Sequence, residues 1–297
     1  MLRKTFWLAG ALALTLAACD DDDDDLVTPP GTTSVTILLT DAPGDILDAV
    51  VTIDQAFVQG TGVSRVDLLD APVTVNLTDL ANTTSELLSG AEVTNGTYSD
   101  LRLVISGAFV EVENEDGSST IFASSPDYSG LPEGATVGGE LTLPADAASG
   151  SLVDFAEDLA LDGGSVSLLA DFNVSQSFTD GGTGAWTLQP VLRGAAAGDA
   201  ATVTVTLALG ADVTLPEGVT LAGFTADLGG ERLAFAEVGG TFTAAFSFVL
   251  PGTYALSLIG PAGLTLTTDP ALPVDVVVGA AGAVTQTVTI TAATPAP

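Results

Sequence analysis

Apolar and polar residues alternate along much of the chain. The segments Val203-Thr204-Val205-Thr206-Leu207 and Val284 to Ile290 change character at nearly every position. Such a period of two buries one face of a β-strand and exposes the other. The runs are short, and Gly, Pro, Asn and Asp, which are typical of turns, separate them. The pattern therefore predicts an all-β protein.

The alternating runs predict strands in two groups. The first group lies near residues 34–40, 49–58, 63–69, 97–106, 108–114, 119–123, 165–172 and 185–192. The second group lies near residues 201–208, 219–227, 231–237, 241–249, 253–259, 273–278 and 284–292. Glu115-Asp116-Gly117 is a predicted hairpin turn in the first group. One helix is expected over residues 79–89, with Thr78 or Asp79 as its N-cap and Gly90 at its end.

The composition changes at Gly194-Ala-Ala-Ala-Gly198, a run of small residues that predicts a flexible linker. We therefore expect two domains, over residues 34–195 and 196–297. Each is long enough to bury a core without disulfides. Many short strands without helices between them favour two antiparallel β-sandwiches of the immunoglobulin or transthyretin type, with the one short helix in the first.

The first 19 residues have the pattern of a lipoprotein signal. Two basic residues precede an apolar run that ends in Leu16-Ala17-Ala18-Cys19. About 13 apolar residues are fewer than the ~20 that a membrane-spanning helix needs. Residues 1–18 are thus a predicted signal peptide, and Cys19 is the predicted lipid-modified first residue of the mature chain. An ordinary secretory signal with a chance cysteine is the alternative.

Residues 19–33 predict a tether between the lipid and the folded part. Asp20 to Asp25 form an unbroken acidic run, and Pro29-Pro30 follows. Like charges in a row repel each other and prolines stiffen the chain, so this segment stays extended. An acidic run behind the lipid also resembles a surface-export tag in some bacteria and an inner-membrane retention tag in others. The expected location is the bacterial cell envelope, with the outer membrane or cell surface favoured over the outer face of the inner membrane.

Composition excludes several kinds of activity. The chain has 38 acidic residues against 6 Lys plus Arg, no His and one Cys, for a net charge of −32. Without His there is no Ser-His-Asp triad and no His-ligated metal, and one Cys forms neither an internal disulfide nor a Cys-rich zinc site. So acidic a surface also repels nucleic acid.

Removal of residues 1–18 also removes two cations, so the mature chain carries 4 − 38 = −34 charges. Its cations are four arginines, and it has no lysine nucleophile. We therefore expect a protein that is not an enzyme. A hydrolase that uses only a pair of carboxylates, in a cleft that separates their pKa values, is the alternative.

Three carboxylates mark a candidate metal site, which we assign to Asp41, Asp45 and Asp48 on the loop that leaves the first strand. Clustered oxygen ligands suit calcium. The spacing matches no EF-hand loop, however, and Asp before Ala-Pro-Gly is also ordinary turn chemistry. Both interpretations stay open, and no other cofactor is expected. Two further acidic groups are interpreted as solvated loops: Glu113, Glu115 and Asp116, and Asp154, Glu157, Asp158 and Asp162.

Five blocks in order resemble a bacterial lipoprotein family, domain of unknown function 4382, over residues 34–195. The blocks are Val35-Thr-Ile-Leu-Leu-Thr-Asp-Ala-Pro-Gly-Asp45, Val75-Asn-Leu-Thr-Asp-Leu80, Gly96-Thr-Tyr-Ser-Asp-Leu-Arg-Leu-Val104, Leu169-Ala-Asp-Phe-Asn-Val174 and Trp186-Thr-Leu-Gln-Pro-Val-Leu-Arg193. The resemblance implies a secreted, lipid-anchored β-sandwich without an established activity. Residues 126–164 depart from the family in being richer in Gly and Ala. Residues 200–297 resemble, less closely, carboxypeptidase-regulatory or transthyretin-like modules, which serve as spacers or adhesion units.

Several single residues have predicted roles. Asp171 and Arg193 are a candidate buried ion pair, with Arg102 as the other candidate cation. Trp186 is predicted to pack in the core, with stacking on a sugar as the alternative. Tyr98 and Tyr254 each follow Gly-Thr, and their hydroxyls are expected to hold neighbouring loops.

The leading hypothesis for function is a non-enzymatic, lipid-anchored binding or structural module. Its expected partners are the membrane, through the lipid on Cys19, and a surface glycan or protein. The alternatives are a calcium-dependent adhesin or glycan-binding surface protein, and the carboxylate-only hydrolase.

Overall fold

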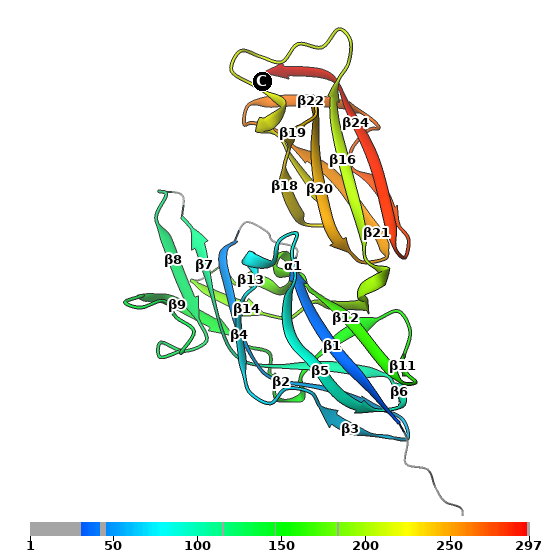
Figure 1. Cartoon of the computed structure of the whole chain (residues 1–297). Coiled ribbons are helices and arrows are strands. Elements are labelled where there is room, and N and C mark those ends of the chain that lie inside the picture. The colour runs from blue at the N-terminus through cyan, green and yellow to red at the C-terminus, as the bar shows by residue number, and fades with distance from the viewer. Residues whose placement is uncertain (1–30, 42–45, 115, 146, 183, 296–297) are drawn as a thin grey trace, which may run out of the picture. The chain divides into compact units, whose positions relative to one another are not determined.

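The computed structural model describes residues 31–41, 46–114, 116–145, 147–182 and 184–295 (Figure 1). Cys19, the predicted signal peptide and most of the predicted tether lie outside these residues. The described chain is mostly β, which confirms the all-β prediction. None of its helices is both long and apolar enough to cross a membrane.

The strands that precede residue 197 belong to two sheets of the described chain. Their bounds are β1 (Thr32–Asp41), β2 (Ile46–Gly60), β3 (Val63–Asp67), β4 (Val73–Asn76), β5 (Ser85–Thr94), β6 (Gly96–Tyr98), β7 (Asp100–Glu113), β8 (Ser119–Ala123), β9 (Val137–Thr142), β10 (Ser151–Phe155), β11 (Leu159–Leu161), β12 (Gly164–Phe172), β13 (Phe178–Asp180), β14 (Ala185–Leu188) and β15 (Leu192–Ala196). The larger sheet runs β13-β14-β9-β8-β7-β10-β15-β12-β1-β5, with β2 paired to β3, β4 and β7, and β6 pairs with β11. The short helix α1 (Val174–Ser177) follows β12.

Alternate residues of these strands face a common hydrophobic core. β1 contributes Val35, Ile37 and Leu39, and β7 contributes Leu101 and Leu103, all of them buried. The period of two that predicted the strands is therefore the period at which side chains enter the core.

The strands after residue 200 form two more sheets. Their bounds are β16 (Ala201–Leu209), β17 (Thr225–Leu228), β18 (Glu231–Ala234), β19 (Ala236–Val238), β20 (Thr241–Val249), β21 (Gly252–Ile259), β22 (Leu264–Asp269), β23 (Val274–Val278) and β24 (Gly282–Pro295). One sheet has the order β19-β20-β16-β24-β22 and the other β18-β17-β21-β23. Buried residues from both, such as Val205 and Phe246 from the first and Leu256 from the second, form one cluster, as in a β-sandwich. The division of the chain into two sandwich domains stays a prediction.

The predicted helix over residues 79–89 is wrong. Thr78–Leu80 form a single 3₁₀ turn, and Ser85–Thr94 form strand β5 at the edge of the sheet beside β1. Gly90 has φ +70° where the register between β1 and β5 shifts, so it serves a β-bulge instead of a helix C-terminus. The open edge of β1 pairs with this segment, and that pairing outweighs its local helix propensity.

Two further expectations need correction. The sheets are mixed instead of purely antiparallel, because β1–β12, β10–β15, β8–β9, β9–β14 and β16–β24 pair in parallel. Long connections bring these strands side by side in the same direction. The predicted flexible linker at residues 194–198 begins inside β15, where Ala195 and Ala196 pair with Leu169 and Leu168 of β12.

Tyr98 and Tyr254 have the predicted structural role. The hydroxyl of Tyr98 donates to the Thr94 carbonyl at 2.7 Å, and that of Tyr254 donates to the Leu250 carbonyl at 2.8 Å. In both cases the acceptor lies four residues earlier, so each ring ties its strand to the chain that leads into it.

Replacing Tyr98 by Phe should lower the free energy of unfolding by about 1 kcal/mol, because the ring is 1 % exposed and the Thr94 carbonyl loses its side-chain donor. Urea unfolding of Tyr98→Phe, compared with the exposed control Ser99→Ala, measures this loss. Equal midpoints for the two variants would contradict the role of the hydroxyl.

Candidate functional site

Three neighbouring strands bring polar residues into one row. Thr40 of β1 lies opposite Asp171 of β12 in the parallel pair, and Asp171 lies opposite Arg193 of β15 in the antiparallel pair. Residues directly opposite each other in adjacent strands point to the same side of a sheet. The strand register thus places Asp171 between a hydroxyl and a guanidinium.

The hairpin between β17 and β18 supplies the facing wall. Leu228 pairs with Glu231, so Gly229 and Gly230 form a two-residue turn, and both have positive φ (+65° and +103°). That geometry favours glycine. A Cβ at Gly229 would lie 2.8 Å from the Tyr254 ring, and one at Gly230 would lie 2.5 Å from Ser175 Oγ. The glycines therefore allow the hairpin to approach both residues closely.

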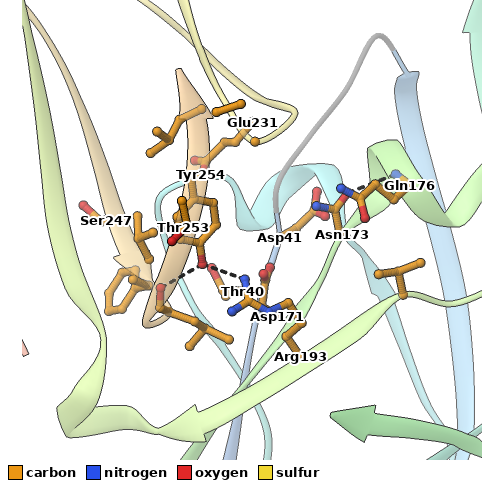
Figure 2. A pocket seen from close by; sticks show the side chains of 17 residues that line it. Thr40, Asp41, Asp171, Asn173, Gln176, Arg193, Glu231, Ser247, Thr253 and Tyr254 are labelled. Carbon is orange, nitrogen blue, oxygen red and sulfur yellow. Dashed lines mark hydrogen bonds between the residues drawn. The ribbon is translucent and has the colours of Figure 1, made fainter. Parts of the chain in front are cut away.

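Together these elements enclose a cavity of about 270 Å³ (Figure 2). We call it the acidic pocket and define it by Asp41, Asp171, Arg193, Glu231 and Tyr254. Other lining residues are polar or apolar: Thr40, Asn173, Gln176, Val191, Leu228, Gly229, Ser247, Phe248, Val249, Leu250, Thr253 and Ala255.

Arg193 connects the two sides of the acidic pocket. Its Nη1 donates to the Tyr254 hydroxyl at 2.7 Å, and its Nη2 donates to the Pro251 carbonyl at 2.8 Å. The guanidinium carbon lies 5.4 Å from the centre of the Tyr254 ring. A side chain from β15 is thereby held by a tyrosine of β21 and by the carbonyl of the residue just before that strand.

The carboxylates of the acidic pocket are buried to different extents. Asp41 is 3 % exposed, and its Oδ1 accepts from the Val174 backbone N–H at 3.0 Å. Glu231 is 8 % exposed, and its Oε1 has no hydrogen-bond partner among the described residues. Glu231 is thus a buried acceptor that lacks a donor at one oxygen.

Burial shapes the protonation of these acids. It raises the pKa of Asp171 to about 6, although the nearby Arg193 guanidinium opposes this increase. Burial also raises the pKa of Glu231 to about 8, and the negative charge of Asp171 adds to that increase. Both carboxyls therefore keep their protons to a higher pH than exposed acids do.

One wall of the acidic pocket has unusual backbone geometry. Phe248 has φ +59°, which is rare for a bulky residue, and its side chain is 37 % exposed. The preceding Ser247 donates its backbone N–H to Asn82 Oδ1 at 2.7 Å. Such strained residues are enriched at functional sites.

The described members of the predicted metal site make different contacts. Asp41 lines the acidic pocket, whereas the carboxylate of Asp48 accepts from the Asn76 side chain at 2.7 Å. Asp45 lies outside the described residues. Within the described ranges, no three acidic or cysteine side chains lie close enough together to hold a metal ion. The calcium assignment stays a prediction.

We expect millimolar calcium to raise the melting midpoint no further than sodium chloride of equal ionic strength, since both screen the acidic surface. A specific site would add about 2.7 kcal/mol at a hundredfold excess over Kd. Thermal melts of residues 31–297 in EDTA, in calcium and in matched salt decide between these outcomes. An excess stabilisation by calcium that Asp48→Asn removes would restore the metal site.

Asp171 lies opposite Arg193 in the strand register, and the Arg193 charge opposes the increase in the Asp171 pKa. Their ion pair stays a prediction. Arg102, the other candidate, instead lies 3.9 Å from Asp100 and donates to the Gly150 carbonyl.

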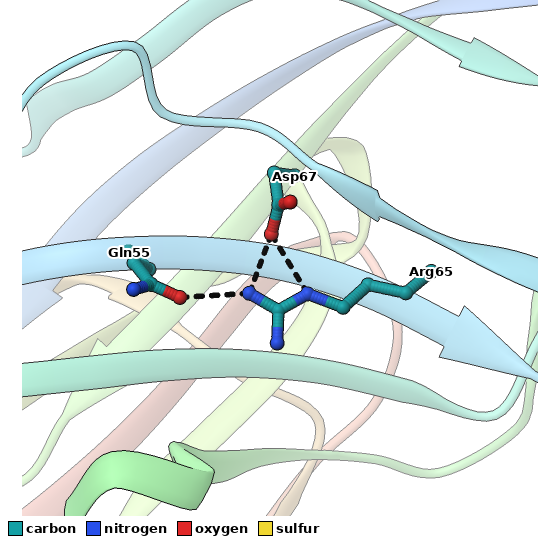
Figure 3. A network of polar contacts seen from close by, with 3 residues as sticks. All are labelled: Gln55, Arg65 and Asp67. Atoms are coloured by element: carbon teal, nitrogen blue, oxygen red, sulfur yellow. Dashed lines mark hydrogen bonds and ion pairs between the residues drawn. The ribbon is translucent and has the colours of Figure 1, made fainter.

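Two other scarce arginines also lie beside aspartates. Arg65 contacts both Asp67, at 2.5 Å, and Gln55, at 2.7 Å (Figure 3). Arg232 donates to Asp227 at 3.0 Å.

Trp186 packs against the core and lies 6.0 Å from the Phe122 ring, centre to centre, which supports the predicted packing role. Asp116 accepts from the Ser118 backbone N–H, as in a turn, whereas Glu115 lies outside the described residues. Asp154, Glu157, Asp158 and Asp162 are exposed.

Glu231 lines the acidic pocket, but the sequence analysis assigns it no role. The sequence signal that could have found it is the Gly229-Gly230 turn, which places the next residue at the start of a hairpin strand.

A family described as Domain of unknown function (DUF4382) matches residues 32–190. The chain belongs to this family. The matched residues include Asp41 and Asp171, whereas Arg193, Glu231 and Tyr254 lie beyond the DUF4382 match. No curated protein sequence matches the chain.

Solved structures show only distant likeness. The Bacillus anthracis TIE protein is 11 % identical to this chain, with a TM-score of 0.22. The match covers 88 % of this chain and 34 % of the TIE chain, so this chain spans about a third of the length of the TIE chain. The major pilin T3.2 of Streptococcus pyogenes is 10 % identical (TM-score 0.21; 88 % and 98 % covered). A C-terminal fragment of the pilus adhesin SpaC from Lactobacillus rhamnosus GG is 13 % identical (TM-score 0.21; 89 % and 98 % covered). Because both the sequence identities and the TM-scores are this low, these similarities do not indicate a function.

Proposed function

We propose that the chain is a lipid-anchored, non-enzymatic binding module of the bacterial envelope, and that its ligand binds in the acidic pocket. The anchor rests on the sequence Leu16-Ala17-Ala18-Cys19 and on the acidic run behind it. Two or more acyl chains on Cys19 would hold the protein stably at a membrane. The outer membrane or cell surface is the favoured location.

The observation that supports binding is the buried carboxyl of Glu231. Its Oε1 lacks a hydrogen-bond partner among the described residues although the side chain is 8 % exposed. Burial of an acceptor without a donor costs stability. Proteins keep such costly groups mainly where function needs them. A ligand that donates a hydrogen bond in the acidic pocket would remove this cost.

The anchor is tested by Cys19→Ala. We expect wild-type protein to incorporate labelled palmitate and to sediment with membranes, and the variant to do neither. Full incorporation of label by the variant would disprove lipidation at Cys19.

The binding role is tested with probes of four classes: calcium, maltose, n-butylammonium and butyrate. We expect one class to stabilise the mature chain in thermal melts, and Glu231→Gln to weaken that stabilisation. Glu237→Gln is the matched control, because Glu237 is exposed on β19. If no probe acts, or if both variants respond like wild type to every probe, the acidic pocket is not a binding site. Maltose or calcium as the active probe would favour the glycan-binding or calcium-dependent alternatives.

A second candidate function is a carboxylate-only hydrolase. The observation in its favour is that Asp171 and Glu231 share one pocket with pKa values of about 6 and about 8. Hydrolysis by two carboxyl groups needs one protonated and one ionised partner. Turnover of nitrophenyl glycosides or esters that Glu231→Gln abolishes would establish this function, and its absence leaves the binding module.

A further inference from the structure

The acidic pocket has more negative than positive groups. Three carboxyl groups line it from β1, β12 and β18, and Arg193 is the cation among the described lining residues. Nη1 of Arg193 donates to the Tyr254 hydroxyl, and Nη2 donates to the Pro251 carbonyl. The guanidinium is thus committed to the protein, and Glu231 Oε1 still lacks a donor among the described residues.

Protonation compensates for this imbalance in the absence of a ligand. The pKa values of Asp171 and Glu231 are both raised, and Asp171 contributes to the increase at Glu231. The other titratable side chains that line the acidic pocket are Asp41, Arg193 and Tyr254, and the pKa of Tyr254 is raised mainly by burial. A positive group between the two carboxyls would favour their ionised forms.

The walls favour an organic cation over a metal ion. Calcium takes six to eight oxygen ligands at about 2.3–2.6 Å, and the described residues contain no group of three acids that could hold a metal. A cavity of about 270 Å³ exceeds the space that a bare ion fills. Apolar residues on the same walls, including Leu228, Val249 and Leu250, would contact methylene groups.

We propose, on the basis of the binding function above, that the acidic pocket takes a protonated primary amine on an alkyl stem. The carboxylates of Glu231 and Asp171 accept its N–H groups, and Leu228, Val249 and Leu250 contact its methylene groups. A primary ammonium supplies three donors and one positive charge. It therefore satisfies Glu231 Oε1 and offsets the excess of carboxylates.

Calorimetric titration of the mature chain in detergent with n-butylammonium tests the proposal. We expect saturable one-to-one binding, and about tenfold or greater weakening in Glu231→Gln and in Asp171→Asn, as loss of a charged hydrogen bond predicts. Glu237→Gln should bind like wild type. Butan-1-ol and butyrate, which match the stem but lack the positive charge, should not bind.

A second readout is the proton count. Binding of an ammonium next to Glu231 should displace its proton, so affinity should rise between pH 6 and pH 8, the range of the two raised pKa values. Titration in buffers with different heats of ionisation measures the released proton. Glu231→Gln should abolish the release near pH 8, where Asp171 is already ionised.

Three results would overturn the proposal. They are no binding of n-butylammonium, equal affinity in Glu231→Gln and wild type, and binding of butan-1-ol as tight as that of the amine. If maltose, calcium or butyrate binds in a way that Glu231→Gln weakens, the amine is wrong but the binding module stands. If no probe binds, the proposed function fails as well.

Discussion

Replacing Glu231 by Gln should raise the free energy of unfolding at pH 8 by roughly 2–4 kcal/mol, and this gain should disappear towards pH 4.5. The folded chain raises the Glu231 pKa from 4.5 to about 8. Below pH 4.5 the carboxyl is protonated in both the folded and the unfolded chain, so burial carries no charge penalty. As the pH rises towards 8, only the unfolded chain ionises freely, and stability falls.

Urea unfolding followed by circular dichroism at several pH values between 4.5 and 8 measures this effect. Glu237→Gln is the control, because that exposed acid should change stability little at any pH. Asp171 contributes a smaller decline of the same sign between its ordinary value of 3.8 and about pH 6. A gain from Glu231→Gln that is constant with pH would mean that the ionisation of Glu231 does not limit stability.

The alternating runs predicted strands because burial and sequence share the period of two. Thr225–Leu228 and Val274–Val278 lie within or close to their predicted ranges. Ser85–Thr94 does not follow this rule, because Leu87 and Leu88 are adjacent buried residues beside a bulge. A strand whose apolar residues are shifted by a bulge resembles a helix in sequence, and only its pairing with β1 settles the conformation.

The acidic pocket was partly predictable. The sequence predicts a pairing of Asp171 with Arg193, because only four cations follow residue 18 and a carboxylate in a strand-like block has few partners. Glu231 and Tyr254 were not assigned to the site, since the sequence does not say which hairpin lies against the ends of β1 and β12. Gly229 comes close to Tyr254 of another strand only when the chain folds, so the sequence alone does not show this contact.

Replacing Arg193 by Met should lower the free energy of unfolding by about 2–5 kcal/mol at pH 8, because it leaves a partly buried carboxylate without its cation. Met keeps much of the length of the side chain but none of its donors. The Tyr254 hydroxyl and the Pro251 carbonyl each lose a hydrogen bond. The pKa of Asp171 should rise further, since Arg193 is the group that opposes its increase.

The destabilisation by Arg193→Met should be smaller at pH 5, because Asp171 is then protonated in much of the variant and leaves less uncompensated charge. Urea unfolding at both pH values measures this difference. Arg65→Met is the matched control, because Arg65 is 41 % exposed and its ion pair with Asp67 contributes about 0–1 kcal/mol. Adding Asp171→Asn to Arg193→Met should recover part of the loss at pH 8, since it removes the uncompensated carboxylate. If the double variant is no more stable than Arg193→Met, Arg193 acts through its contacts with Tyr254 and Pro251 alone, and the charge of Asp171 does not contribute to stability.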